Sequence, residues 1–210
     1  MKEILKLTLS VTFICALAGA ALAFVSHKTH DRIEANEAAQ RTVQMRLVLP
    51  PETAAAEKEE ALGNAKVEFF AAKDADGRLI GYCALSKTND GFGGDLSVMA
   101  GLTIDGCITA ILVSEHNETP GIGSRVCNRT VTESLWGKLF GKGGAGKQEG
   151  LAPNAYLDGF SGRALPQDGF AFGASEASRN VTCVSGATFS STAVLHAVNN
   201  ICDAWKARKN

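Results

Sequence analysis

The sequence SGATFSST, at residues 185–192, joins a run of small residues to the start of a helical pattern. After it, apolar side chains recur at spacings of three and four, at Val194, Ala197, Val198, Ile201 and Trp205. This period predicts an amphipathic helix that packs one face against the rest of the fold. The helix is expected to begin within the hydroxyl-rich residues 188–192.

The hydroxyl cluster has two interpretations. Ser and Thr side chains often cap a helix by accepting hydrogen bonds from its unpaired amides. The same amides, at the positive end of the helix dipole, also favour a bound phosphate. Gly186 permits backbone angles closed to other residues and lets a ligand approach closely. The local chemistry alone favours capping.

The segments that read as strands form two hairpins. The expected strands are residues 67–72, 78–86, 95–104 and 107–114. Asp74-Ala75-Asp76-Gly77 separates the first two and Asp105-Gly106 the last two, and both are turn sequences. A further strand is expected within 151–184, a short helix at 130–140 and a Gly-rich loop at 141–150. The predicted fold class is α+β, an antiparallel sheet with packed helices.

The N-terminus carries a long apolar run at residues 7–25. As a helix it would be roughly 28 Å long, enough to cross a bilayer core. A signal peptide is the alternative, since Ala21-Leu22-Ala23 resembles a cleavage site. A helical pattern continues over 27–49 and ends at Pro50-Pro51, and 53–62 suits a short helix or a solvated connector.

These features divide the chain into three parts. Residues 1–26 are predicted to be a cytoplasmic tip and transmembrane anchor, 27–66 a helical connector, and 67–210 one extracytoplasmic domain. The net charge is −1, so no basic excess indicates nucleic-acid binding. No two of the six cysteines have C-x-x-C spacing, and no metal site is predicted. Buried thiols are favoured, and one disulfide stays open.

Two loops contain glycines beside the predicted strands. Residues 91–94, Gly-Phe-Gly-Gly, lie between the hairpins and allow close backbone approach. Residues 116–125, HNETPGIGSR, follow directly on the last strand. This arrangement is typical of a binding loop held by a rigid sheet, although an ordinary surface connection has the same composition.

The order of these motifs resembles the FMN-binding domain family over about residues 67–200. SGAT is similar to the family's flavinylation motif, and GFGG, the Asp-Gly hairpin and ETPGIG occur in the family's order. The family includes the G subunit of Rnf-type electron transport complexes and the C subunit of Na+-translocating NADH:quinone oxidoreductase. The resemblance implies a covalent FMN on Thr188 through a phosphoester. The other implied contacts are Ser185, Gly186, Ala187, Glu118, Thr119, Gly121 and Gly123.

The resemblance also implies a role as an electron carrier. It implies a single-pass subunit of the bacterial inner membrane, working with other membrane subunits of an Rnf-type complex and matured by an FMN transferase. Such complexes couple ferredoxin/NAD electron transfer to Na+ or H+ translocation. The motif departs at Thr182, where the family usually has Asp. The alternatives are a stand-alone anchored flavoprotein and a flavin-free interaction domain. No catalytic residue is predicted.

Overall fold

The computed structural model describes residues 2–59, 66–129, 151–173 and 179–209. The chain forms two compact units, Met1–Thr42 and Val43–Asn210. The first unit consists of most of the helix α1 (Lys2–Val48). This helix is long and apolar enough to cross a membrane, two properties that signal sequences near an N-terminus share. It ends just before Pro50-Pro51, as expected of residues that cannot continue a helix.

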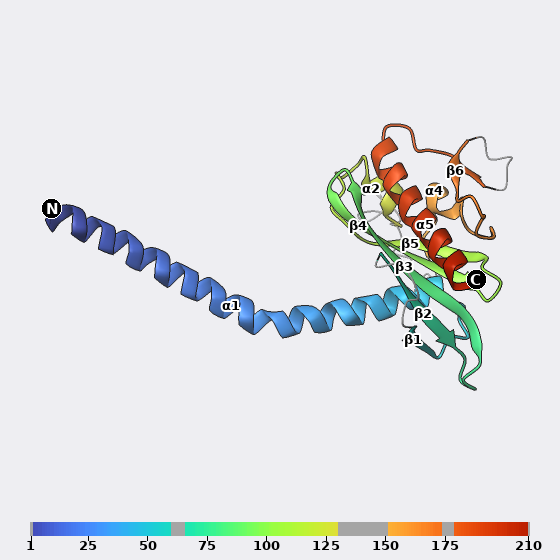
Figure 1. The fold of residues 1–210 in the computed structure, drawn as a ribbon, viewed down its shortest axis with the longest axis horizontal. Coiled ribbons are helices and arrows are strands. Elements are labelled where there is room, and N and C mark those ends of the chain that lie inside the picture. Colours follow the sequence, from blue (N-terminus) through green and yellow to red (C-terminus); the bar gives the residue numbers. More distant parts are fainter. Residues whose placement is uncertain (1, 60–65, 130–150, 174–178, 210) are drawn as a thin grey trace, which may run out of the picture. The chain divides into compact units, whose positions relative to one another are not determined.

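The second unit is built on a five-stranded antiparallel sheet (Figure 1). Its strands follow one another in chain order: β1 (Ala55–Glu59), β2 (Val67–Lys73), β3 (Leu79–Gly91), β4 (Gly94–Thr103) and β5 (Ile108–His116). The elements after the sheet are α2 (Ser124–Cys127), α4 (Ala155–Asp158), β6 (Ala171–Phe172), β7 (Asn180–Val181) and α5 (Thr188–Lys209). The predicted α+β class and both predicted hairpins are confirmed.

The further strand expected in 151–184 is a small pair, β6 with β7, and it is parallel. The helix predicted at 130–140 and the loop predicted at 141–150 lie outside the described residues. Both hairpin turns carry the predicted glycine at positive φ, Gly77 at 77° and Gly106 at 86°. Local turn chemistry therefore sets the register of both hairpins.

Strand β1 corrects the expectation for residues 53–62. Ala and Glu favour a helix there, but 55–59 pair with β2 as an edge strand. Ion pairs across strands support this pairing, from Lys58 to Glu68 at 3.0 Å and from Lys73 to Glu57. Arg208 of α5 holds the end of the strand through Glu59, 2.8 Å away. Tertiary partners thus override the local helix preference.

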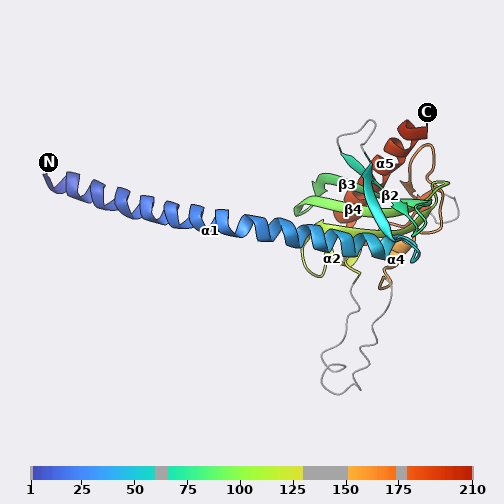
Figure 2. The same ribbon diagram turned by 90° about the horizontal axis from the view of Figure 1, so that it is seen from below.

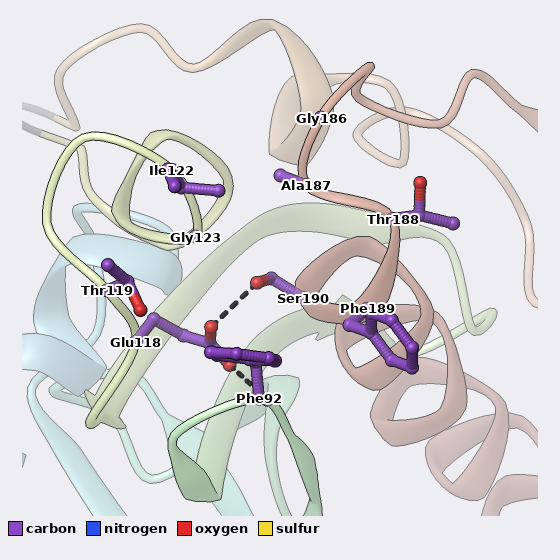
Figure 3. A pocket seen from close by; sticks show the side chains of 10 residues that line it. All are labelled: Phe92, Glu118, Thr119, Ile122, Gly123, Gly186, Ala187, Thr188, Phe189 and Ser190. Atoms are coloured by element: carbon purple, nitrogen blue, oxygen red, sulfur yellow. Dashed lines mark hydrogen bonds between the residues drawn. The ribbon is translucent and has the colours of Figure 1, made fainter.

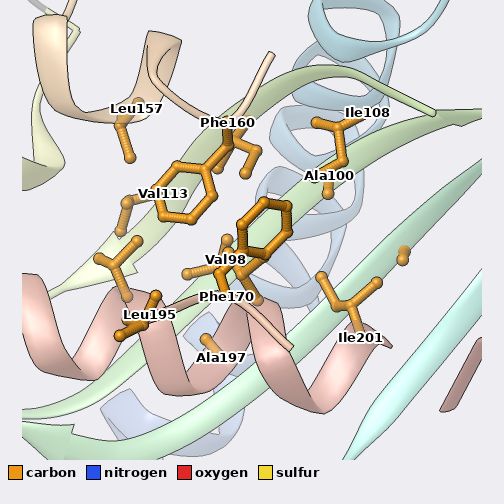
Figure 4. Packing of buried hydrophobic residues seen from close by; sticks show 14 of the residues in the cluster. Val98, Ala100, Ile108, Val113, Leu157, Phe160, Phe170, Leu195, Ala197 and Ile201 are labelled. Carbon is orange, nitrogen blue, oxygen red and sulfur yellow. The ribbon is translucent and has the colours of Figure 1, made fainter. Parts of the chain in front are cut away.

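The sheet buries apolar side chains on both faces, because successive residues of a strand point to opposite sides. On one face α5 crosses β3 and β4 (Figures 1 and 2). Its apolar side belongs to the same buried cluster as Tyr82, Val98 and Ile111. Phe160 and Phe170 complete this core, with ring centroids 5.2 Å apart (Figure 4). The helix predicted from the SGAT junction is therefore the main cover of the sheet.

The opposite face packs against the last turn of α1. Met45, Val48 and Leu49 are buried there with Cys83 and Met99. The Val48 carbonyl accepts a hydrogen bond from Thr109 Oγ1 at 2.7 Å, so one of the open carbonyls at the helix end is satisfied. The second unit thus begins at Val43 because these side chains belong to its core.

Candidate functional site

Helix α5 begins at a tight turn formed by the SGAT motif. The Ala187 amide donates to the Val184 carbonyl at 3.1 Å, and Gly186 has a φ of 81°. A positive φ at the third residue is typical of a type II turn and explains the glycine. The Ser191 amide then donates to Ala187 O at 2.9 Å, and the Ser191 hydroxyl accepts from the Val184 amide at 3.3 Å. Ser191, rather than Thr188, closes the turn onto the helix.

The Thr188 hydroxyl is free of this network. Thr188 is exposed, and its side chain makes no hydrogen bond with any residue that the structure describes. Only its carbonyl is engaged, accepting from Thr192 Oγ1 at 2.8 Å. The interpretation of the cluster as simple caps therefore does not account for Thr188. Its hydroxyl stands at a helix N-terminus, where partial positive charge favours a phosphate.

The loop after β5 brings a buried carboxylate to the same place. Glu118 is only 7% exposed. Its Oε2 accepts a hydrogen bond from Ser190 Oγ at 2.7 Å, and its Oε1 accepts one from the Phe92 amide at 2.9 Å (Figure 3). One side chain therefore links three segments that are distant in sequence: the β3–β4 turn, the loop after β5 and the first turn of α5.

Glycines make this close packing possible. A Cβ on Gly93 would lie 1.8 Å from the Asn117 carbonyl oxygen, so the GFGG turn can rest on the loop after β5 only without a side chain there. A Cβ on Gly123 would lie 2.3 Å from Glu118 Oε2 and 2.6 Å from Ser190 Oγ. The two glycine-containing loops singled out in the sequence thus meet each other and α5.

These segments enclose a small pocket of about 140 Å³ (Figure 3). Its lining residues are Phe92, Glu118, Thr119, Ile122, Gly123, Gly186, Ala187, Thr188, Phe189 and Ser190. Six of the eight predicted contacts are among them. Gly121 instead lines a neighbouring pocket with Arg125 and Asn154. Ser185 is the exposed second residue of the turn and lines neither pocket.

Four residues that line this pocket were not predicted as contacts from the sequence. Phe92 is 69% exposed, Phe189 71% and Ile122 53%. Because they are exposed, they do not belong to the periodic pattern of buried apolar residues that predicts core positions. Phe92 and Phe189 lie at the mouth of the pocket with their ring centroids 6.3 Å apart. Ser190 is buried and was read only as part of the hydroxyl cluster. Aromatic residues within or directly after the glycine motifs GFGG and SGAT are the sequence signal that could have indicated Phe92 and Phe189.

His116 has a structural role. Its Nε2 lies 2.6 Å from Asn128 Oδ1, and its Nδ1 accepts from the Glu118 amide at 3.3 Å.

Thr182, where the resemblance leads one to expect Asp, is exposed two residues before the turn. The six cysteines are unpaired, with Cys83, Cys127 and Cys202 buried, as the sequence composition favoured.

The pocket residues fit one part of a flavin nucleotide. Sites that enclose small ligands measure about 300–1,000 Å³, so this pocket can surround only part of FMN. The exposed rings of Phe92 and Phe189 offer apolar surface to a planar ring system at its mouth. A free hydroxyl at the start of a 22-residue helix suits the phosphate end.

Comparison with known proteins agrees with this fit. The G subunit of the Na+-translocating ferredoxin:NAD+ oxidoreductase complex from Acetobacterium woodii is 26% identical over 210 residues, covering 94% of this chain and 89% of that protein. The G subunit of the ion-translocating oxidoreductase complex from Methanosarcina acetivorans is 29% identical over 130 residues, covering 60% and 69%. The corresponding G subunit from Stutzerimonas stutzeri is 34% identical over 140 residues, covering 63% and 58%.

Among solved structures, NqrC from Shewanella oneidensis superimposes with a TM-score of 0.45 at 17% identity, covering 78% of this chain and 73% of that one. The model of the FMN-binding domain matches residues 91–203, more than half of the chain. This match includes the GFGG turn, the loop after β5 and the whole SGAT junction. The chain belongs to the FMN-binding domain family.

Proposed function

We propose that this chain is the G subunit of an Rnf-type ion-translocating oxidoreductase complex and carries FMN esterified to Thr188. The observation that carries the proposal is the free, exposed hydroxyl of Thr188 at the mouth of the pocket. The similarity to G subunits of such complexes supports the assignment. When bound, FMN supplies one- and two-electron transfer, and the protein supplies attachment and orientation.

The attachment requires a separate FMN transferase and a donor with an activated phosphate. In this step the Thr188 oxygen would form a bond to the phosphorus of FMN as the phosphoanhydride bond of the donor breaks. The other half of the donor would leave as a phosphate monoester, and the hydroxyl proton would pass to solvent. Thr188 suits this reaction because nothing among the described residues holds its hydroxyl. The Gly186 turn keeps the acceptor accessible, with no atom within 4 Å of the position of a Cβ there.

The pocket residues then hold the two ends of the cofactor differently. The first turn of α5 offers amide donors to the phosphate, and the rings of Phe92 and Phe189 offer apolar surface to the flavin. The N-terminal helix serves as a single-pass anchor in the bacterial inner membrane. In this proposal residues 1–26 are the anchor, the following part of α1 up to Thr42 connects it to the domain, and the domain from Val43 is extracytoplasmic.

The test is the intact mass of the full chain, made together with an FMN transferase. We expect an increase equal to FMN minus one water in the wild type and none in Thr188→Val. Thr192→Val, one turn further along α5, is the matched control and should keep the added mass. An unmodified wild type, or added mass on Thr188→Val, would contradict the attachment. Co-purification with several polytopic membrane subunits tests the assignment to a complex, and purification without them would favour a stand-alone flavoprotein.

A further inference from the structure

Glu118 is a buried acidic side chain without a cationic partner. It is 7% exposed, and among the described residues no Lys, Arg or His side chain forms an ion pair with it. Burying a carboxylate is costly unless hydrogen bonds compensate for the lost water. A fold keeps such a group at a pocket only when neighbouring donors hold it there.

Two neutral donors hold the carboxylate of Glu118. Each oxygen accepts a bond from a neutral donor, Oε2 from the Ser190 hydroxyl and Oε1 from the Phe92 amide. An ionised carboxylate is purely an acceptor, so it matches a donor at each of its two oxygens. Because both donors are neutral, they do not cancel the charge of an ionised Glu118 carboxylate.

The position of this charge is fixed from three sides. Ser190 belongs to the rigid helix α5, and Phe92 to the β3–β4 turn. The backbone of Gly123 packs closely against the carboxylate, since a Cβ added there would lie 2.3 Å from Oε2. Glu118 therefore cannot turn out into solvent without breaking two hydrogen bonds, and its charge stays in the pocket that Thr188 also lines.

We propose that Glu118 lowers the midpoint potential of the flavin esterified to Thr188. Reduction adds negative charge to a flavin, and a fixed, uncompensated carboxylate in the same pocket opposes that charge. Ser190 and the Phe92 amide are positioning groups, since they act through Glu118. This inference rests on the proposed function, because it requires the flavin at Thr188. It assigns to Glu118 a lower flavin potential than the same pocket would give without this carboxylate.

The experiment is a spectroelectrochemical titration of the full-length flavinylated chain and of Glu118→Gln. Neutralising the carboxylate should raise the midpoint potential. At the wild-type midpoint, we expect the reduced-to-oxidised ratio to increase at least tenfold, or about 30 mV for a two-electron couple. Glu115→Gln is the matched control, since Glu115 is an exposed carboxylate three residues earlier, and its potential should stay close to wild type.

Further variants separate charge from disturbance of the pocket. Ser190→Ala removes one donor but keeps the carboxylate, so it should not raise the potential. Glu118→Met, which is uncharged and of similar length, replaces Glu118→Gln if that variant takes up no flavin. The proposal is overturned if the midpoint potential of a flavinylated neutral variant at position 118 differs from that of the wild type no more than the potential of Glu115→Gln does. It is also overturned if Ser190→Ala raises the midpoint potential as much as the neutral variant does. Intact mass, measured first, keeps these outcomes apart from failed attachment, because a wild type without flavin refutes the proposed function itself.

Discussion

Replacing Gly123 with alanine is expected to break the hydrogen bond that joins Ser190 to Glu118. The added methyl group would lie 2.3 Å from Glu118 Oε2 and 2.6 Å from Ser190 Oγ. Both distances are well inside van der Waals contact, so at least one of the two side chains has to move. The bond between them is 2.7 Å long and buried, and it cannot keep this geometry around a methyl group.

The size of the effect follows from two contributions. A hydrogen bond to a charged group contributes about 1.5–3 kcal/mol to the free energy of unfolding. Forcing an extra methyl group into a packed site costs about 1–3 kcal/mol. Movement of the carboxylate relieves part of the clash, so the two contributions overlap. We therefore expect Gly123→Ala to lower the free energy of unfolding by about 2–4 kcal/mol.

The assay is urea unfolding of the full chain in detergent, followed by far-UV circular dichroism. A Thr188→Val background keeps attached flavin from contributing to stability. Gly121→Ala is the control: its φ of 81° imposes backbone strain of roughly 1–2 kcal/mol, but no atom lies within 4 Å of its Cβ position. In a Ser190→Ala background the cost of Gly123→Ala should shrink, because the bond is already absent. An equal cost in both backgrounds would refute the reasoning.

Two further predictions concern titratable groups. The His196 hydrogen bond, with a smaller contribution from Thr88, lowers the pKa of Asp90 below its usual 3.8. The stability from this carboxylate is present above pH 3.8 and is lost as the pH falls through the folded-state pKa, so urea unfolding of Asp90→Asn should depend less on pH in that acid range. Burial raises the pKa of Cys83, Cys127 and Cys202 to about 12, so within the folded domain iodoacetamide should label Cys107 and Cys183 before these three. Peptide mass spectrometry reads out the labelling, and modification of Cys83 before unfolding would contradict the prediction.

The parts of the fold that the sequence predicted are those set by local chemistry. Gly77 and Gly106 mark the two hairpin turns because their positive φ is closed to most other residues. The apolar period after residue 192 marks α5 because one face of that helix is buried. Strand β1 was missed because its Ala, Glu and Lys residues favour a helix. Its partners, Glu68, Lys73 and Arg208, lie elsewhere in the chain.

The candidate site was predicted in outline from motifs and in detail only from the structure. The bond between Glu118 and Ser190 joins residues 72 positions apart, and no local pattern predicts such a pairing. The resemblance to the family brought the two glycine loops and SGAT together as one site. It did not indicate that Ser191 closes the helix turn and leaves Thr188 free. That distinction depends on how the Ser191 hydroxyl is oriented, which cannot be read from the spacing of residues in the sequence.

The small size of the pocket gives a physical reason for the proposed covalent bond to the cofactor. Sites that retain a free ligand of this size bury about 70–90% of its surface, and a pocket of about 140 Å³ cannot do so for FMN. The proposed ester at Thr188 would make the remaining contacts intramolecular, so that weak apolar contact with Phe92 and Phe189 would be enough to orient the flavin. Much of the flavin would then stay accessible at the surface. That arrangement suits an electron relay between proteins better than an enzyme that must enclose a substrate and exclude water.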